Sequence, residues 1–195
     1  MPRTLNEIFG RSPALARLGS APLVLIDCQN DYLDGPLALS GVEAAVDAAA
    51  RLLAAARQRG ARVIHVVQQG AAGRLFDLDG RGGAIIDRLA PRDGEAVVVK
   101  TRPNGFSGTT LLAKLEGRGT EFVVAGFMTH NCVSSTARAA LDLGLFPTIA
   151  ADACATRDLP APGGTIAAAD LQRAELAALA DRHAVVAGVD VLLAT

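Results

Sequence analysis

The sequence predicts a single α/β domain of three layers, in which helices cover both faces of a six-stranded, mainly parallel, doubly wound sheet. Six short apolar runs are continuous instead of alternating with polar residues, as expected for parallel strands that are covered on both faces. Helical patterns lie between these runs, and such a succession of strands and helices forms right-handed βαβ units. Half of the 195 residues are hydrophobic, which is enough for one large core.

The expected elements can be placed in order along the chain. We expect strands at residues 23–27, 62–67, 96–100, 121–125, 146–150 and 184–186. We expect helices at residues 42–59, 108–115, 132–143 and 167–182. The first helix has the clearest pattern, because its apolar residues recur at helical spacing and Gly60 ends it. The order of the strands stays open between the two common doubly wound arrangements.

No linker, repeat or low-complexity segment divides the chain, so we expect one domain over residues 1–195. Within it, residues 1–20 form an N-terminal extension that packs on the domain or at an oligomer interface. Residues 70–83 are rich in glycine and poor in apolar side chains. They predict a long loop near the strand ends, of the kind that often covers a site.

Composition excludes several classes of partner. The formal net charge is −1, and no basic face or polybasic run points to nucleic acid or to a membrane surface. No apolar run approaches the ~20 residues that a spanning helix needs, and the N-terminal segment lacks the apolar core of a secretory signal. Three cysteines at unrelated spacings suit a reducing compartment. We therefore expect a cytoplasmic homo-oligomer, a dimer or larger, that acts on a small molecule.

Three chemically useful side chains follow apolar runs. Asp27 and Lys100 end two expected strands, and Cys132 stands where a third strand gives way to a helix. Ligands of open α/β sheets sit at the carboxyl ends of the strands, so these side chains can meet. A nearby cation and a helix N-terminus favour thiolate, which predicts a lowered pKa for Cys132.

Ordinary structural roles compete with this interpretation. A free cysteine is often a small buried hydrophobe, Asp27 could cap a turn, and Lys100 could end its strand in solvent. Buried charges are nevertheless costly unless they are paired. We therefore predict an ion pair between Asp27 and Lys100.

Four segments, spread from about residue 22 to residue 189, resemble the isochorismatase-like cysteine hydrolase superfamily. They are LVLIDCQNDYL, KTRPNGFSGTTL, VVAGFMTHNCVSSTARAALDLG and IAADACATRD. The resemblance implies a catalytic triad of Asp27, Lys100 and Cys132. In it the sulfur attacks a carbonyl carbon, Asp27 moves the thiol proton to the leaving group, and Lys100 balances the charge. It also implies a cis peptide bond between Phe127 and Met128, and we predict the N–H groups of Met128 and Cys132 as an oxyanion hole.

Further residues are expected around the site. Gln29 and Asn30 follow the acid and should order its loop, and Gln68 matches a position where isochorismatase itself uses a glutamine. Aromatic residues in these loops are as often packing as recognition. The predicted substrate-binding residues are Asn30, Tyr32, Gln68, Phe106, Phe127 and His130. Cys28 should lie in the core, and Cys154 should be structural.

The chain departs from the nicotinamidases of this superfamily, which add a metal site of an aspartate and histidines after the second strand. The corresponding segment here contains Asp77 and Asp79 but no histidine, and the three histidines of the chain are scattered. We therefore predict no metal and no cofactor.

Taken together, the resemblance implies a metal-independent cysteine hydrolase that cleaves the C–N bond of a small amide, ureido or carbamoyl compound through a thioacyl-enzyme intermediate. A thiol in the triad favours this chemistry over vinyl-ether cleavage, which needs no cysteine nucleophile. One alternative is a catalytically silent protein of the same fold. The other is a nucleotide-binding or small-molecule-binding α/β protein, although the first strand-to-helix turn, DCQNDYLDG, lacks a glycine-rich phosphate cradle.

Overall fold

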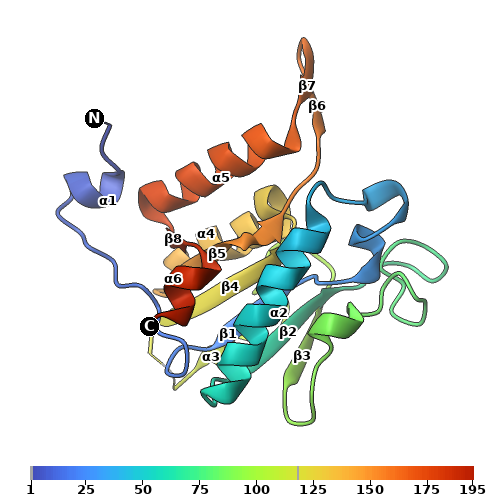
Figure 1. Ribbon diagram of the computed structural model, residues 1–195, viewed down its shortest axis with the longest axis horizontal. Coiled ribbons are helices and arrows are strands. Elements are labelled where there is room, and N and C mark those ends of the chain that lie inside the picture. The colour runs from blue at the N-terminus through green and yellow to red at the C-terminus, as the bar shows by residue number, and fades with distance from the viewer. Residues whose placement is uncertain (1, 118) are drawn as a thin grey trace.

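The protein is built on one parallel sheet of six strands. The computed structural model describes residues 2–117 and 119–195. The strands lie in the order β3-β2-β1-β4-β5-β8, and every neighbouring pair is parallel (Figure 1). Their bounds are β1 Leu23–Ile26, β2 Val63–Gln68, β3 Ala96–Lys100, β4 Glu121–Phe127, β5 Phe146–Ala155 and β8 Val185–Ala187. The predicted sheet is confirmed, and its direction of winding reverses between β1 and β4, where a ligand crevice is expected.

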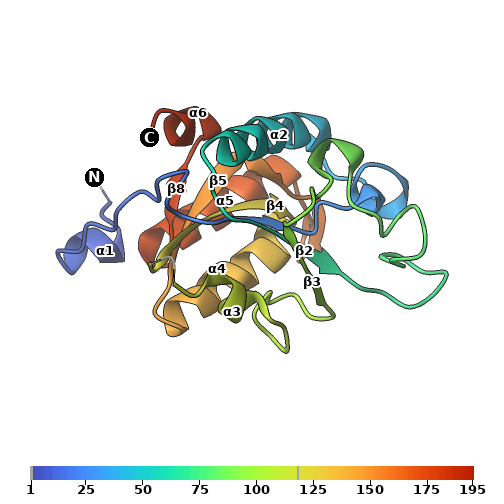
Figure 2. The ribbon, with the colours of Figure 1, turned by 90° about the horizontal axis from the view of Figure 1, so that it is seen from below.

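Helices cover both faces, which confirms the predicted three layers. In Figure 2, α2 (Val42–Gln58) and α6 (Val189–Leu193) lie on one side of the sheet, and α3 (Leu111–Leu115) and α4 (Ser134–Asp142) lie on the other. The long helix α5 (Ala168–Arg182) joins the second side, because its Leu179 belongs to the same apolar cluster as residues of α3 and α4. Each face therefore has its own core, and both cores meet the sheet.

Shorter elements were not predicted. They are α1 (Leu5–Ile8), the 3₁₀ turns Asn30–Tyr32, Gly35–Leu37 and Asp87–Leu89, a π turn at Thr129–Val133, and the antiparallel hairpin of β6 (Leu159–Ala161) and β7 (Gly164–Ile166). The hairpin projects from the body of the domain (Figure 1). The predicted helix 108–115 is confined to α3, and the predicted strand 146–150 is longer, because the register between β4 and β5 shifts and pairing resumes at Cys154.

The N-terminal extension contacts the domain at two places: Ala16 is buried and donates its N–H to Oγ1 of Thr148 on β5 at 3.0 Å, and the first part of the extension contacts α5. The N–H of Leu5 donates to Asp181 at 2.7 Å, and the guanidinium of Arg182 lies 5.6 Å from the centre of the Phe9 ring. Met1, at the start of this extension, lies outside the described residues. No helix in the described part of the chain is both long and apolar enough to cross a membrane.

Candidate active site

Asp27 directly follows β1 and adopts an unusual backbone conformation. Its φ of 50° lies in the left-handed region, which non-glycine residues seldom adopt. The neighbouring strand is held very close at this level, because a Cβ on Gly126 would lie 2.0 Å from the carbonyl oxygen of Ile26. Only glycine fits there. The glycine in β4 therefore allows Asp27, at the end of β1, to lie close to the turn that follows β4.

Lys100 ends β3, and its side chain reaches across β2 to the acid. Its Nζ lies 2.8 Å from Oδ2 of Asp27, and neither side chain has exposed surface. The predicted ion pair is confirmed. Pairing offsets the cost of burying both charges.

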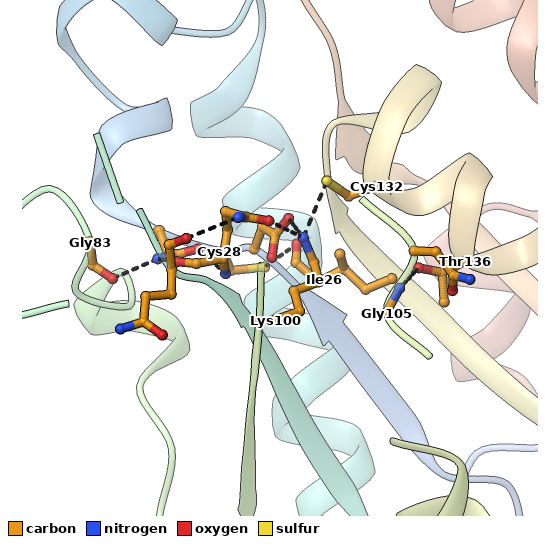
Figure 3. Close-up of polar contacts among 12 residues, drawn as sticks. Ile26, Cys28, Gly83, Lys100, Gly105, Cys132 and Thr136 are labelled. Atoms are coloured by element: carbon orange, nitrogen blue, oxygen red, sulfur yellow. Dashed lines mark hydrogen bonds and ion pairs between the residues drawn. The ribbon is translucent and has the colours of Figure 1, made fainter. Parts of the chain in front are cut away.

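The ammonium group of Lys100 has two further partners. It donates to Oε1 of Gln68 at 2.7 Å and to Sγ of Cys132 at 3.4 Å, and Figure 3 shows the contact with the sulfur. Together with Asp27, these partners match the three N–H bonds of an ammonium group. Lys100 is therefore held in one place, between the carboxylate and the thiol.

Cys132 lies in the π turn Thr129–Val133, which connects β4 to α4. Cys132 is 4% exposed and belongs to one of the two apolar clusters, so its sulfur does not lie in open solvent. The peptide bond between Phe127 and Met128, which leads into this turn, is cis. Helix α4 starts two residues after the cysteine, at Ser134.

The predicted lowering of the Cys132 pKa is wrong for the ligand-free protein. Burial, and next the negative charge of Asp27, raise the pKa of the thiol to about 12, although Lys100 opposes the rise. Burial also raises the pKa of Asp27, again against the effect of Lys100. At neutral pH the thiol of Cys132 in the resting site is therefore protonated and neutral.

Gln29 fixes the loop that follows the acid. Its side-chain amide is fully buried, donates to the carbonyl oxygens of Gln68 and Gly83 at 2.9 and 2.7 Å, and accepts from the N–H of Gln68 at 2.9 Å. Asn30 donates to the carbonyl oxygen of Arg81 at 2.9 Å. The prediction that these two residues order their loop is confirmed.

Residues 21–190 of this chain match the family model of the isochorismatase domain. The chain belongs to the isochorismatase family. A secreted isochorismatase effector of Verticillium dahliae is 37% identical over 180 residues, which make up 91% of this chain and 93% of that protein. A maleamate amidohydrolase of Pseudomonas putida is 32% identical over 164 residues, 75% of this chain and 73% of that protein. The crystal structure of an isochorismatase from Pseudomonas putida is 44% identical, with a TM-score of 0.96 over 98% of this chain and 100% of that one.

In this isochorismatase-family protein, three of the predicted substrate-binding residues make defined contacts within the protein itself. Both polar atoms of the Gln68 side chain are engaged, Oε1 with Lys100 and Nε2 with the carbonyl oxygen of Gln69 at 3.1 Å. Tyr32 and Phe127 are 2% and 0% exposed and pack with ring centres 5.7 Å apart. Both rings pack in the core, and contact of Tyr32, Gln68 and Phe127 with substrate stays a prediction.

The other predicted substrate-binding residues keep some free surface. Asn30, Phe106 and His130 are each half-buried. The ring of Phe106 packs edge-on against Phe122, and Nδ1 of His130 contacts Oγ1 of Thr156. Contact of these residues with substrate stays a prediction, as does the oxyanion hole. Among the described residues, neither Met128 nor Cys132 donates its backbone N–H to a group outside its own helix or strand.

One positioning contact was missed. Thr136 on α4 is fully buried, and its Oγ1 accepts from the N–H of Gly105 at 2.9 Å (Figure 3). This bond ties the loop that follows Lys100 to the helix that follows Cys132. A buried threonine in a helix gives no such signal in the sequence, because its partner lies 31 residues away.

No group of three or more histidine, cysteine, aspartate or glutamate side chains within residues 2–117 and 119–195 is arranged to hold a metal ion. Cys28 and Cys154 are both buried in the apolar clusters and free. Burial raises the pKa of each thiol. Their surroundings match the structural roles expected for them.

Proposed function

We propose that the protein is a metal-independent cysteine hydrolase that cleaves the C–N bond of a small amide, ureido or carbamoyl compound. One observation carries the proposal: the ammonium group of Lys100 contacts both the carboxylate of Asp27 and the sulfur of Cys132. A nucleophile, a base and a cation so arranged are the parts of an activated covalent catalyst.

In the first half of the proposed reaction, the sulfur of Cys132 attacks the carbonyl carbon while its proton passes to Asp27. The resulting oxyanion accepts hydrogen bonds from the N–H groups of Met128 and Cys132. Asp27 then gives the proton to the leaving nitrogen as the C–N bond breaks. Ammonia or an amine departs, and a thioester stays on Cys132.

In the second half, Asp27 takes a proton from water, and the oxygen attacks the thioester carbon. The C–S bond breaks, the acid leaves, and the proton returns to the sulfur. Asp27 suits both steps, because burial raises its pKa and so makes it a better proton acceptor than an exposed carboxylate.

The neutral resting thiol fits this scheme. Because the pKa of Cys132 is raised, the proton leaves the sulfur only when a base is in place and the carbonyl carbon is being attacked. Lys100 contacts both reacting groups and holds them together. The named activity of one relative, maleamate amidohydrolase, supports C–N cleavage as the class of reaction.

Hydrolysis of isochorismate is a second candidate. It is favoured by the similarity to proteins described as isochorismatases, at 44% and 37% identity. Cleavage of a vinyl ether needs no thiol nucleophile, so the two candidates differ in their need for Cys132.

A screen for ammonia release over small amides, ureido acids and carbamoyl compounds tests the proposal. Isochorismate is included, with pyruvate release as its signal. We expect ammonia release by the natural protein in the presence of a chelator, none by Cys132→Ala, and unchanged release by Cys154→Ala, whose buried cysteine is outside the triad. Pyruvate release that survives Cys132→Ala, without ammonia from any compound, would establish the second candidate instead.

A further inference from the structure

The N-terminal helix α1 presents its apolar side chains to solvent and a polar one to the domain. Its buried residue is Asn6, at 5% exposed, and Oδ1 of this side chain has no hydrogen-bond partner in the described part of the chain. Leu5, Ile8 and the following Phe9 are instead 37%, 56% and 60% exposed. A helix on the surface of a domain normally turns its apolar side chains toward the core. The outer face of α1 therefore lacks an apolar surface that covers it.

Helix α1 is nevertheless a well-formed element. Thr4 and Glu7 make a complete capping box, in which Oγ1 of Thr4 accepts from the N–H of Glu7 and the Glu7 carboxylate accepts from the N–H of Thr4. A single helical turn is unstable in water unless it packs against something. A capped turn with apolar side chains on its outer face is therefore suited to packing against a further surface.

The β6–β7 hairpin presents a second uncovered apolar surface. It leaves the domain at the N-terminal end of α5, whereas α1 contacts Asp181 and Arg182 at the C-terminal end of the same helix (Figure 1). No charged residue occurs in residues 159–169, and Ile166 is 42% exposed. A two-stranded hairpin on its own is at best marginally stable in water, so the hairpin also lacks a partner surface.

The outer face of α5 connects the hairpin to α1. Its exposed residues recur every three or four positions, and all are alanines except one aspartate and one arginine, which form an ion pair with each other. They are Ala169, Asp170, Arg173, Ala174, Ala177 and Ala178. Small side chains let a second helix approach closely, and the ion pair leaves the face without net charge.

We propose that a second copy of the chain covers this face, in a two-fold symmetric dimer with the two α5 helices antiparallel. A two-fold axis across α5 brings the hairpin of each copy to the α1 end of the other, so one interface covers both apolar surfaces. A face without net charge does not repel its own copy. Helix α5 is about 22 Å long, and the hairpin and α1 extend the face at its two ends. Such a face approaches the roughly 800 Å² that each partner of a stable dimer buries.

Sedimentation of the natural protein and of two surface variants tests the inference. We expect a dimer at micromolar concentrations. Phe9→Asp should raise its dissociation constant at least ~10-fold, because aromatic side chains buried in an interface often carry much of the binding energy. Val191→Asp is the matched control, because Val191 is 53% exposed on α6, on the other side of the sheet from α5. A natural protein that sediments as a monomer, or equal dissociation constants of the two variants, overturns the inference.

Cross-linking near the two-fold axis gives a second test, which does not depend on weakening the dimer. In an antiparallel pair of helices, a residue near the axis meets its own counterpart. Ala174→Cys, in the middle of the outer face of α5, should therefore give a covalent dimer with a short bismaleimide. Ala54→Cys, which replaces an exposed alanine of α2, should stay monomeric, and the three natural cysteines are buried. No cross-link through Ala174→Cys, or an equal yield from Ala54→Cys, overturns the antiparallel arrangement.

Discussion

At the scale of single residues, the proposed reaction depends on a proton that moves between two groups, Asp27 and Cys132, whose pKa values are both raised. Burial raises the pKa of Asp27 and of Cys132, and Lys100 opposes the rise in each. The negative charge of Asp27 is itself a cause of the raised pKa of the thiol. The acid therefore suppresses the thiolate at rest and, in the proposed reaction, accepts its proton during attack.

This coupling predicts that Asp27→Asn makes the thiol more acidic while it abolishes hydrolysis. Without the carboxylate, Lys100 remains as the charge beside the sulfur and favours thiolate. The pH dependence of alkylation of Cys132 by iodoacetamide, followed by mass spectrometry, should shift to lower pH in Asp27→Asn. Cys28 and Cys154 serve as internal controls, because both are buried and should react slowly. An unchanged or higher midpoint would show that Asp27 does not control the thiol.

Gln68 carries a second prediction at this scale. Its Oε1 accepts from the ammonium of Lys100 at 2.7 Å, so Gln68→Leu should leave that N–H bond unsatisfied and loosen the lysine. We expect kcat to fall about 10-fold with little change in KM, because the lost bond is to the triad and not to the substrate. Gln69→Leu is the matched control, since Gln69 is the exposed neighbour. A rise in KM with an unchanged kcat would show instead that Gln68 binds the substrate.

The sequence was sufficient to predict that Asp27, Lys100 and Cys132 lie together, because each follows an apolar run that ends at the same edge of the sheet. The role of Gln68 was not predictable, because it depends on a lysine side chain that crosses one strand to reach the next. The pKa of Cys132 could not be predicted from the sequence either. The nearby cation and helix suggested a lowered pKa, but burial of the thiol, which only the folded structure gives, raises it.

At the scale of elements, the close approach of β1 and β4 brings the acid and the nucleophile turn together. Gly126 has a φ of 123°, and the nearest atoms to an added Cβ belong to the backbone of Ile26. Backbone atoms in a central strand cannot move aside as a flexible side chain can. The distance between β1 and β4 at the site therefore depends on the lack of a side chain at Gly126.

Gly126→Ala should lower the free energy of unfolding by roughly 4 kcal/mol, as measured by urea denaturation. Gly144→Ala is the control, because Gly144 has a φ of 76° but nothing within 4 Å of an added Cβ. That variant should lose only about 1 kcal/mol, the cost of the left-handed backbone alone. Similar losses in the two variants would mean that β1 and β4 are not so closely packed.

Elements with a regular apolar pattern were predicted well, and irregular ones were not. The helix expected at 42–59 is α2, because its small apolar residues form one buried face. The π turn at Thr129–Val133 and the β6–β7 hairpin were missed. Both depend on the path that the chain takes between elements, for which a short stretch of sequence has no distinctive periodicity.

At the scale of the whole molecule, a buried ionic cluster at the other end of the sheet links stability to pH. Arg57 binds Glu95 through two hydrogen bonds of 2.8 Å and lowers the pKa of that carboxyl to about 2. Nε2 of His65 contacts the same carboxylate at 3.1 Å, and burial lowers the pKa of this histidine. The fold therefore favours an ionised Glu95 and a neutral His65.

Because the pKa values of Glu95 and His65 are both lowered in the folded protein, its stability falls as the pH falls. Glu95 contributes fully above its ordinary pKa of 4.5, and its contribution is lost as pH falls toward about 2. Below pH 6.5 the unfolded chain takes up the His65 proton before the folded protein does. We expect Glu95→Gln to reduce the loss of unfolding free energy between pH 7 and pH 3 by about 2 kcal/mol. Glu43→Gln, which removes an exposed partner of Arg88, should leave the pH profile unchanged, and an equal effect of both variants would contradict the assignment.

The three layers and the single sheet followed from the sequence, because continuous apolar strands have to be covered on both faces. Strand order did not, since it depends on which crossover each helix makes. The cytoplasmic location and the homo-oligomeric state stay predictions, and one relative is described as secreted.

The central claim is that Cys132 carries the acyl group of the substrate, and partitioning measures this directly. An accepted primary amide and its N-methyl amide are each hydrolysed in the presence of hydroxylamine, and the ratio of hydroxamate to acid is measured. A shared thioester predicts the same ratio for both, because the two leaving groups have departed before hydroxylamine and water compete. Ratios that differ between the two amides would contradict the account.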